Sequence, residues 1–250
     1  MKTAIQAGAS LALAAACLCL SPSASAGPSD YVITPIVEQG EREIDLKAGV
    51  ARLRDGSRER QHSVGLGLGV NSRWFTEVYA IWHQPPGERH SFDAWEWENK
   101  FQLTETGKYP VDVGLLLELE RPKDRSEGYE LRWGPLLQAD LGTRVQANLN
   151  LLLGKHYRSS VPGPAELGYQ WQLKYRWRPA FEFGAQGFGE LGPWDRWLPG
   201  SAQQHRAGPA MFGRLKVGER QVVKYNAAWL LGLNDGAARN VFRMQAEYEF

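Results

Sequence analysis

The last ten residues, Val-Phe-Arg-Met-Gln-Ala-Glu-Tyr-Glu-Phe at positions 241–250, decide the fold of this chain. From Phe242 onward, apolar and polar side chains alternate up to the carboxyl terminus. The apolar set is Phe242, Met244, Ala246, Tyr248 and Phe250, and the polar set is Arg243, Gln245, Glu247 and Glu249. A period of two places the sets on opposite faces of a β-strand. The stretch therefore predicts a strand with one apolar face and one wet face.

The same alternation recurs from Arg42 to the carboxyl terminus, in about twelve segments. Most segments have the length that a tilted strand needs to cross a bilayer, and their charges are sorted onto one face. The connections alternate between longer charged loops and mostly shorter turns, with residues 104–110 as a long exception. Because unpaired strand edges are costly in lipid, the sheet must close on itself. The sequence predicts an all-β fold, a closed antiparallel transmembrane β-barrel of about 12 strands.

This terminal strand is similar to that of the outer-membrane β-barrel proteins of Gram-negative bacteria. Their final strand typically ends in Phe, with aromatic or apolar residues at alternate positions before it. The resemblance rests on residues 241–250 and is to a broad, porin- and transporter-like class rather than to one member. It implies a place in the outer membrane, contact with outer-membrane lipid, and recognition of Tyr248 and Phe250 by the barrel-assembly machinery. It also implies transport as the broad role.

The amino-terminal segment is typical of a secretory signal. Lys2 precedes an apolar run at 4–20, and Ala24-Ser25-Ala26 forms a cleavage site. We therefore expect a signal peptide at 1–26, an amino-terminal arm at 27–41 and the barrel domain at 42–250. The alternative is a lipoprotein with Cys17 lipidated, but the better cleavage site lies downstream. Pro28 and Pro35 argue against a central strand in the arm. Whether residues 31–37 form an extra strand or a plug stays open.

Composition narrows the class of protein further. Both cysteines, Cys17 and Cys19, lie in the signal peptide, so the mature chain would have no disulfide and no cysteine-ligated metal. Cleavage would remove only Lys2 of the 29 basic residues and would leave 28 basic and 28 acidic residues. Because the mature chain would have no net positive charge, nothing in its composition favours binding to nucleic acid. Ten Trp, nine Tyr and nine Phe suit aromatic girdles at two membrane interfaces. A secreted or periplasmic binding sandwich is the alternative.

The charges assigned to the inner face fall into two arcs. A candidate acidic wall consists of Glu96, Glu98, Asp112, Glu118 and Glu130, and a candidate basic wall consists of Lys174, Arg176, Arg214, Lys216, Lys224 and Arg243. In a ring of twelve strands these arcs would lie roughly opposite, and the field between them would favour polar or zwitterionic solutes. The alternative is that these groups pair and fill the lumen. Twelve strands lie between filled and open barrels, so both interpretations stand.

No catalytic site, metal site or cofactor is predicted. Outer-membrane phospholipases use a His and a Ser on a barrel strand, spaced His-x-Ser and followed by Asn-Gly. Here His62 and Ser63 are adjacent and Val64 follows, so their side chains would point apart. The remaining histidines lie near strand ends without metal-ligand spacing. The repeat Gly65-Leu66-Gly67-Leu68-Gly69 precedes no helix, and we expect it to bend the strand or admit another side chain.

The sequence therefore predicts a narrow channel or passive transporter for small polar solutes rather than an enzyme. Two alternatives remain for the barrel. A structural or adhesive barrel would have a plugged lumen, and a lipid-modifying barrel enzyme would need an outward-facing nucleophile near the rim.

Overall fold

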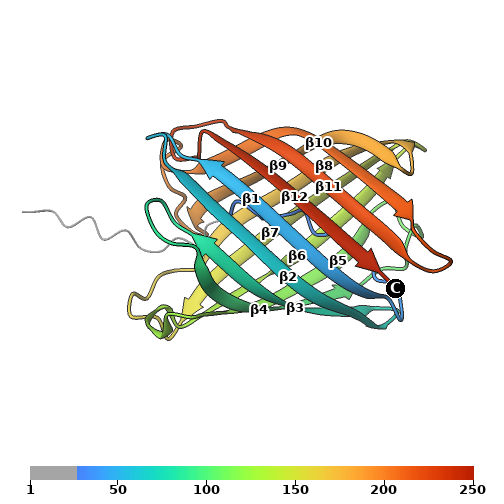
Figure 1. Ribbon diagram of the computed structural model, residues 1–250, viewed down its shortest axis with the longest axis horizontal. Helices are drawn as coiled ribbons and strands as arrows, with labels where there is room; N and C mark the ends of the chain where they lie inside the picture. The colour runs from blue at the N-terminus through green and yellow to red at the C-terminus, as the bar shows by residue number, and fades with distance from the viewer. Residues whose placement is uncertain (1–26) are drawn as a thin grey trace, which may run out of the picture.

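A computed structural model describes residues 27–250, so the predicted signal peptide and both cysteines lie outside the described residues. Twelve antiparallel strands form a closed ring in chain order, inclined to the long axis of the barrel (Figure 1). This confirms the predicted all-β barrel and its number of strands. No helix within 27–250 is long and apolar enough to span a membrane. The strands are β1 (Arg42–Arg52), β2 (Arg58–Asn71), β3 (Trp74–Gln84), β4 (Ser91–Gln102), β5 (Asp112–Pro122), β6 (Tyr129–Leu141), β7 (Val145–Tyr157), β8 (Glu166–Arg178), β9 (Phe181–Pro193), β10 (Gln204–Lys216), β11 (Val222–Gly232) and β12 (Asn240–Glu249), with one short 3-10 helix, η1 (Arg125–Glu127).

The first and last strands close the barrel. β12 pairs with β11 on one side and with β1 on the other, with Ile44 opposite Tyr248. The amide of Phe250 also donates to the carbonyl of Arg42 at 2.9 Å. The apolar set of the terminal strand faces outward, and the Tyr248 and Phe250 rings stack with their centroids 5.8 Å apart. The last ten residues thus complete the ladder that a membrane barrel requires.

The two ends of the barrel differ. Arg42 and Phe250 lie at one end, here the terminal end, together with the connections 72–73, 103–111, 142–144, 179–180 and 217–221. The opposite end, here the loop end, carries connections of five residues or more, at 53–57, 85–90, 123–128, 158–165, 194–203 and 233–239. The predicted alternation of loops and turns is therefore present with two exceptions at the terminal end, which are 103–111, close to the long connection that the sequence indicates at 104–110, and 217–221, which is as long as 53–57.

Several strands extend farther toward the loop end than the apolar pattern indicates. β2 begins at Arg58 and β10 at Gln204, whereas the alternating apolar residues of these strands begin only at Val64 and Met211. The reason is that hydrogen bonding between strands does not depend on side-chain polarity. The hydrogen-bonded ladder continues toward the loop end beyond the band of alternating apolar residues, and polar or charged residues occupy its last positions.

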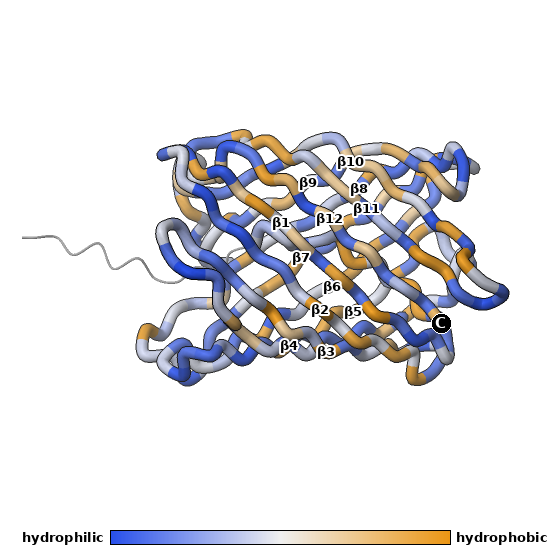
Figure 2. The backbone as a smooth tube through the Cα atoms, viewed as in Figure 1, coloured by the Kyte–Doolittle hydropathy of each residue, from blue (hydrophilic) through white to orange (hydrophobic). Residues whose placement is uncertain are grey.

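The outer face is apolar and the inner face is mixed. Figure 2 shows apolar and polar residues alternating along the strands. Exposed apolar side chains include Leu66, Val78, Trp97 and Phe242. The expectation that the inner face is polar is only partly right, because Leu116, Leu136, Leu152, Phe188, Phe212 and Leu230 are buried inside the ring. These inward apolar residues gather in two clusters on different parts of the wall.

The glycine repeat of β2 admits neighbouring side chains, as the sequence predicts. A Cβ at Gly65 would lie 2.4 Å from the Tyr79 ring, and one at Gly67 would lie 2.5 Å from the Phe75 ring. A Cβ at Gly69 would lie 2.0 Å from the carbonyl oxygen of Glu38. The absent side chains therefore leave room for two inward aromatic rings and for the arm.

Replacing Gly65 with Val should destabilise the barrel by about 1–3 kcal/mol, because Tyr79 is fully packed and would be forced from its place. The Tyr79 hydroxyl would then lose its 2.7 Å bond to Asp45. Urea unfolding in lipid vesicles measures the free energy. Gly200→Val is the control, because nothing lies within 4 Å of the corresponding position in its exposed loop and its φ is outside the left-handed region. Equal losses for the two variants would contradict the packing role of Gly65.

Candidate functional site in the barrel lumen

The amino-terminal arm, residues 27–41, lies inside the ring (Figure 1). None of its residues belongs to a strand, so the open question about residues 31–37 is answered as a plug. Val32 packs on the inward cluster of Phe188, Phe212 and Leu230, whereas Ile33 packs on the cluster of Leu116, Leu136 and Leu152. Because adjacent residues of an extended chain point in opposite directions, the arm contacts both apolar clusters at one level.

Polar bonds fix the arm along its length. The amide of Val37 donates to Gln102 Oε1 at 2.8 Å, and Asn150 Nδ2 donates to the carbonyl of Ile33 at 2.9 Å. Near its start, Ser29 Oγ donates to Gln61 Oε1 at 2.7 Å. Near its end, the amide of Gly40 donates to the carbonyl of Gly69 at 2.8 Å. The arm therefore runs from the loop-end half of the lumen to the terminal end.

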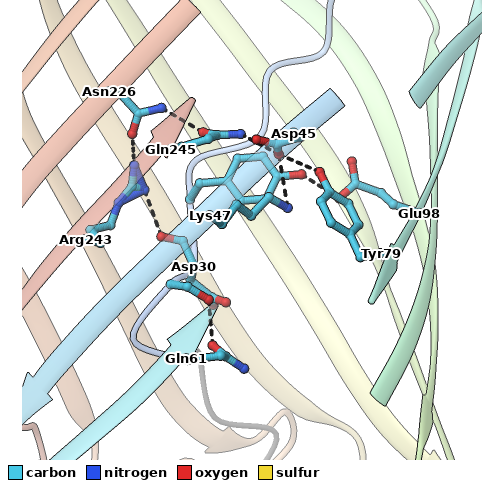
Figure 3. A network of polar contacts seen from close by, with 11 residues as sticks. Asp30, Asp45, Lys47, Gln61, Tyr79, Glu98, Asn226, Arg243 and Gln245 are labelled. Carbon is cyan, nitrogen blue, oxygen red and sulfur yellow. Dashed lines mark hydrogen bonds and ion pairs between the residues drawn. The ribbon is translucent and has the colours of Figure 1, made fainter. Parts of the chain in front are cut away.

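A buried network joins the arm to three strands (Figure 3). Arg243 donates to the carbonyl of Asp30 at 2.8 Å and also bonds Asn226 Oδ1. Asn226 donates to Gln245, which donates to Asp45 Oδ2 at 2.9 Å. The Asn226, Gln245 and Asp45 bonds hold Arg243 in position, and Arg243 in turn fixes the backbone of the arm at Asp30.

Lys47 lies at the centre of this network. Its ammonium group is 3.6 Å from the centroid of the Tyr31 ring and 3.5 Å from that of the Tyr79 ring. It is also 3.7 Å from Asp45 Oδ2, and Tyr31 donates to Glu98 Oε2 at 2.7 Å. A cation between two aromatic faces is stabilised by both rings. Tyr31 thereby connects the arm to β1, β3 and β4.

The arm divides the lumen into two cavities. The terminal-end cavity has a volume of about 400 Å³ and the loop-end cavity about 210 Å³. Tyr31 and Ile33 line both of them, so these two residues belong to the partition between them. The lumen is therefore interrupted in this conformation at the level of the two apolar clusters.

The candidate acidic wall is largely brought together. Carboxylate oxygens of Glu96, Glu98 and Glu118 lie within 4.8 Å of one another, and Glu130 is buried close to them beside Arg132. Asp112 is separate, since it accepts the amide of Gly107 in the turn at the terminal end. Two rows cross neighbouring strands here. Glu96, Glu120 and Glu130 face one another in one row, and Glu77, Glu98 and Glu118 in the next.

The candidate basic wall lies mostly toward the terminal end and is mostly paired. Lys174 is 3.3 Å from Glu182, Arg176 is 2.9 Å from Asp140, Arg214 is 3.6 Å from Glu249, Lys224 is 3.1 Å from Glu41, Arg243 belongs to the buried network, and Lys216 is exposed at the end of β10. The acidic residues line mainly the loop-end cavity, so the two sets are offset along the axis of the barrel.

Carboxylates outnumber cations around the loop-end cavity. Its lining contains eight Asp and Glu residues against Lys47 and Arg132, a formal balance of 2 − 8 = −6. The terminal-end cavity has eight against four, a balance of 4 − 8 = −4. In η1 at the rim, burial raises the pKa of Glu127, and the charges of Asp124 and Asp93 raise it further. The formal charge of both cavity linings is therefore negative, and the raised pKa reduces the share that Glu127 contributes to it.

The adjacent histidine and serine of β2 lie on opposite faces of the barrel wall, whereas some lumen carboxylates are grouped. Ser63 is buried on the inner face of β2, whereas His62 stacks on Trp82 on the outer face, so they form no nucleophile–base pair. Glu41, Glu43 and Glu249 form a second group of carboxylates, and Lys224 contacts two of its members. An ammonium group thus already compensates part of that charge.

Sequence reasoning missed the most constrained residues of the lumen. Tyr31, Val32 and Ile33 lie in a segment too short to show periodicity, and the alternation of residues 42–52 identifies Lys47 only as one polar residue of a strand. One signal for the arm is present in the sequence, because Leu116, Leu136 and Phe188 stand at positions that alternate onto the lumen-facing side of their strands. A buried apolar side chain on the wet face of a barrel requires an apolar partner inside it.

Known proteins were compared with this chain by sequence and by structure. No family model and no curated protein matches the sequence. Among solved structures, an outer-membrane channel from Pseudomonas putida F1 is similar with a TM-score of 0.60 at 10% identity, over 88% of this chain and 98% of that chain. The NanC porin is similar with a TM-score of 0.55 at 9% identity, over 83% and 98%. The translocator domain of the autotransporter NalP from Neisseria meningitidis is similar with a TM-score of 0.53 at 10% identity, over 85% and 88%. The chain therefore has the fold of the outer-membrane β-barrels of Gram-negative bacteria, without a match to a specific member.

Proposed function

We propose that the protein is a narrow outer-membrane channel that favours small cationic solutes and is closed when the arm occupies the lumen. The observation that carries this proposal is the uncompensated negative charge around both cavities. Like charges that face one another across strands repel, so the rows of Glu96, Glu120 and Glu130 are stabilised when a mobile cation lies between them. The pore-like geometry of the similar folds supports passage as the role.

The proposal includes the setting of the channel. The apolar outer face and the exposed aromatic residues support a place in the outer membrane, surrounded by its lipid, after export through the signal peptide. Recognition of Tyr248 and Phe250 by the assembly machinery is part of the same proposal. Their outward, stacked placement at the terminal end is compatible with contact by another protein.

A closed structural barrel is the second candidate, and the packing of Val32 and Ile33 favours it. The two functions differ in one respect. A channel must have an accessible conformation in which the partition between the cavities is removed, whereas a structural barrel needs none.

The test is ion selectivity in planar bilayers under a salt gradient. The protein should pass K⁺ in preference to Cl⁻. The double substitution Glu96→Gln and Glu120→Gln should bring the permeability ratio toward unity, because both carboxylates line the loop-end cavity. If the native protein opens too rarely, the measurement uses a background with Val32→Ala and Ile33→Ala.

The matched control removes the same charge where it is already paired. Asp140→Asn with Glu182→Gln leaves the loop-end cavity unchanged, because these carboxylates pair with Arg176 and Lys174 toward the terminal end. It should alter selectivity less than the Glu96 and Glu120 pair. Anion preference in the native protein, or equal effects of the two pairs, would reject the cationic pathway. No current in the arm-weakened background would favour the structural barrel.

A further inference from the structure

The outer face of the barrel carries charge of one sign. Within the described strands, every Asp and Glu belongs to the lumen-facing set by its register, except Asp93, which lies at a register shift and lines the loop-end cavity. Outward-facing charged residues are all basic, and they are Arg42, Arg52, Arg58, Arg60, Arg121, Lys155 and, after a register shift that places it opposite Phe181, Arg178. Arg42 and Arg178 lie at the terminal end. The other five, here the basic collar, lie toward the loop end.

Three members of the basic collar form a compact group on β1 and β2. Arg52 is directly opposite Arg58, and Arg60 is two residues along the same face. All three are exposed, and no ion pair joins any of them to a carboxylate among residues 27–250. Arg60 donates only to the neutral Gln84, at 3.4 Å. Because like charges directly opposite on a sheet destabilise it, this arrangement would be stabilised by an anion from outside the chain.

Aromatic side chains locate the collar relative to the membrane. Trp82 lies on the same outer face as Arg60, one register step closer to the barrel centre, and pairs with His62. His62 stacks between Trp82 and His90, with centroid distances of 5.2 and 4.6 Å. Arg121 lies 4.1 Å from the Tyr129 ring centroid. Trp and Tyr gather at the interface between hydrocarbon and headgroups, so the arginines lie at the level of the headgroups.

We propose that the basic collar binds the phosphate groups of lipids in the leaflet around the loop end, with Arg52, Arg58 and Arg60 as its main site. A guanidinium group donates two parallel bonds to a phosphate, and three of them can share a headgroup that carries two phosphates. Charge complementarity selects this occupant over a protein or a neutral lipid. The site faces the bilayer and stays accessible whether the lumen is open or closed.

The test measures the affinity of the full mature chain for fluorescent diphosphoryl lipid A in neutral detergent micelles. Replacing Arg52, Arg58 and Arg60 with Gln should weaken binding by about a hundredfold, since each basic residue near an anionic lipid surface contributes roughly fivefold. The matched control replaces Arg73, Arg144 and Arg220, which lie in connections at the terminal end, and should bind as the native chain does. Both variants keep heat-modifiable migration as a check of folding.

Two further probes identify what is bound. Dephosphorylated lipid A should bind about as weakly to the native chain as diphosphoryl lipid A binds to the triple variant. Inorganic phosphate at millimolar concentration should fail to displace the diphosphoryl lipid. Unchanged affinity in the Arg52, Arg58 and Arg60 variant would overturn the proposal. So would equal loss in the control variant, or displacement by phosphate alone, which would indicate a simple anion site.

Discussion

Replacing Val32 and Ile33 together with Ala should convert a barrel that is closed most of the time into one that is open most of the time. Ile33 belongs to the partition between the cavities, Val32 is its neighbour in the arm, and each packs on its own inward apolar cluster. Truncating a buried Ile costs about 2–5 kcal/mol, and the smaller Val adds to this. A total of about 4 kcal/mol would shift the balance between seated and released arm by roughly a thousandfold.

The measurement is the open probability of single barrels in planar bilayers. Thr34→Ala is the matched control in the same arm, because Thr34 is only partly buried and belongs to neither apolar cluster. It should behave as the native chain. The strand ladder does not involve the arm, so the ring should remain intact in the double variant. A double variant that folds and stays silent would mean that the arm does not control passage.

A reversible crosslink gives an independent test of the same partition. Ser29→Cys and Gln61→Cys introduce two thiols where the native side chains touch at 2.7 Å, in a mature chain predicted to have no other thiol. Bridging them with a short bis-methanethiosulfonate, which forms a disulfide with each thiol, should restore closure in the Val32 and Ile33 variant, and a reductant should reverse it by cleaving those disulfides. Openings that persist at full crosslinking would show that the current bypasses the arm.

Replacing Arg132 with Gln should produce the largest loss of barrel stability, about 3–5 kcal/mol. Its guanidinium lies 3.2 Å from Glu118 and 3.7 Å from Glu130, and both carboxylates are almost fully buried. Removing one partner of a buried ion pair leaves the other charge without compensation. Urea unfolding in vesicles measures the loss.

Removing the carboxylates that replacement of Arg132 leaves unpaired should restore the free energy of unfolding. The triple variant Arg132→Gln, Glu118→Gln and Glu130→Gln should recover most of the loss, because no unpaired charge then remains at this place. Arg176→Gln is the control, since its partner Asp140 is 53% exposed and the pair is worth about 1 kcal/mol or less. Without recovery in the triple variant, the Arg132 effect would have to come from lost packing rather than from charge.

The fold follows from the sequence because each strand residue contacts one of two media. Lipid outside and a wet lumen inside impose the period of two that is visible in residues 241–250 and in β8. Strand number, closure and the alternation of loops and turns all follow from this pattern. The loop-end limits of β2 and β10 do not, since their ladders continue through residues that no apolar pattern marks.

The interior is harder to predict because it depends on contacts between distant segments. The alternation says that Glu98 and Lys47 face the lumen, but not that Tyr31 from the arm reaches both. The offset of the acidic and basic sets along the axis depends on strand tilt and register, which the spacing of residues does not contain. Leu136 and Phe188 depart from the expected polar lumen because they pack against Ile33 and Val32 of the arm, a segment that the strand pattern does not describe.

The arm also constrains how the molecule is built. Its start lies beside Gln61 and its end continues directly into β1, so it threads the ring from one mouth to the other. The hydrogen bonds between β1 and β12 form the seam of that ring. Because the arm is continuous with β1, the simplest order of assembly places it along the inner face of the sheet before β1 and β12 pair. The arm would then already occupy the lumen when the barrel closes.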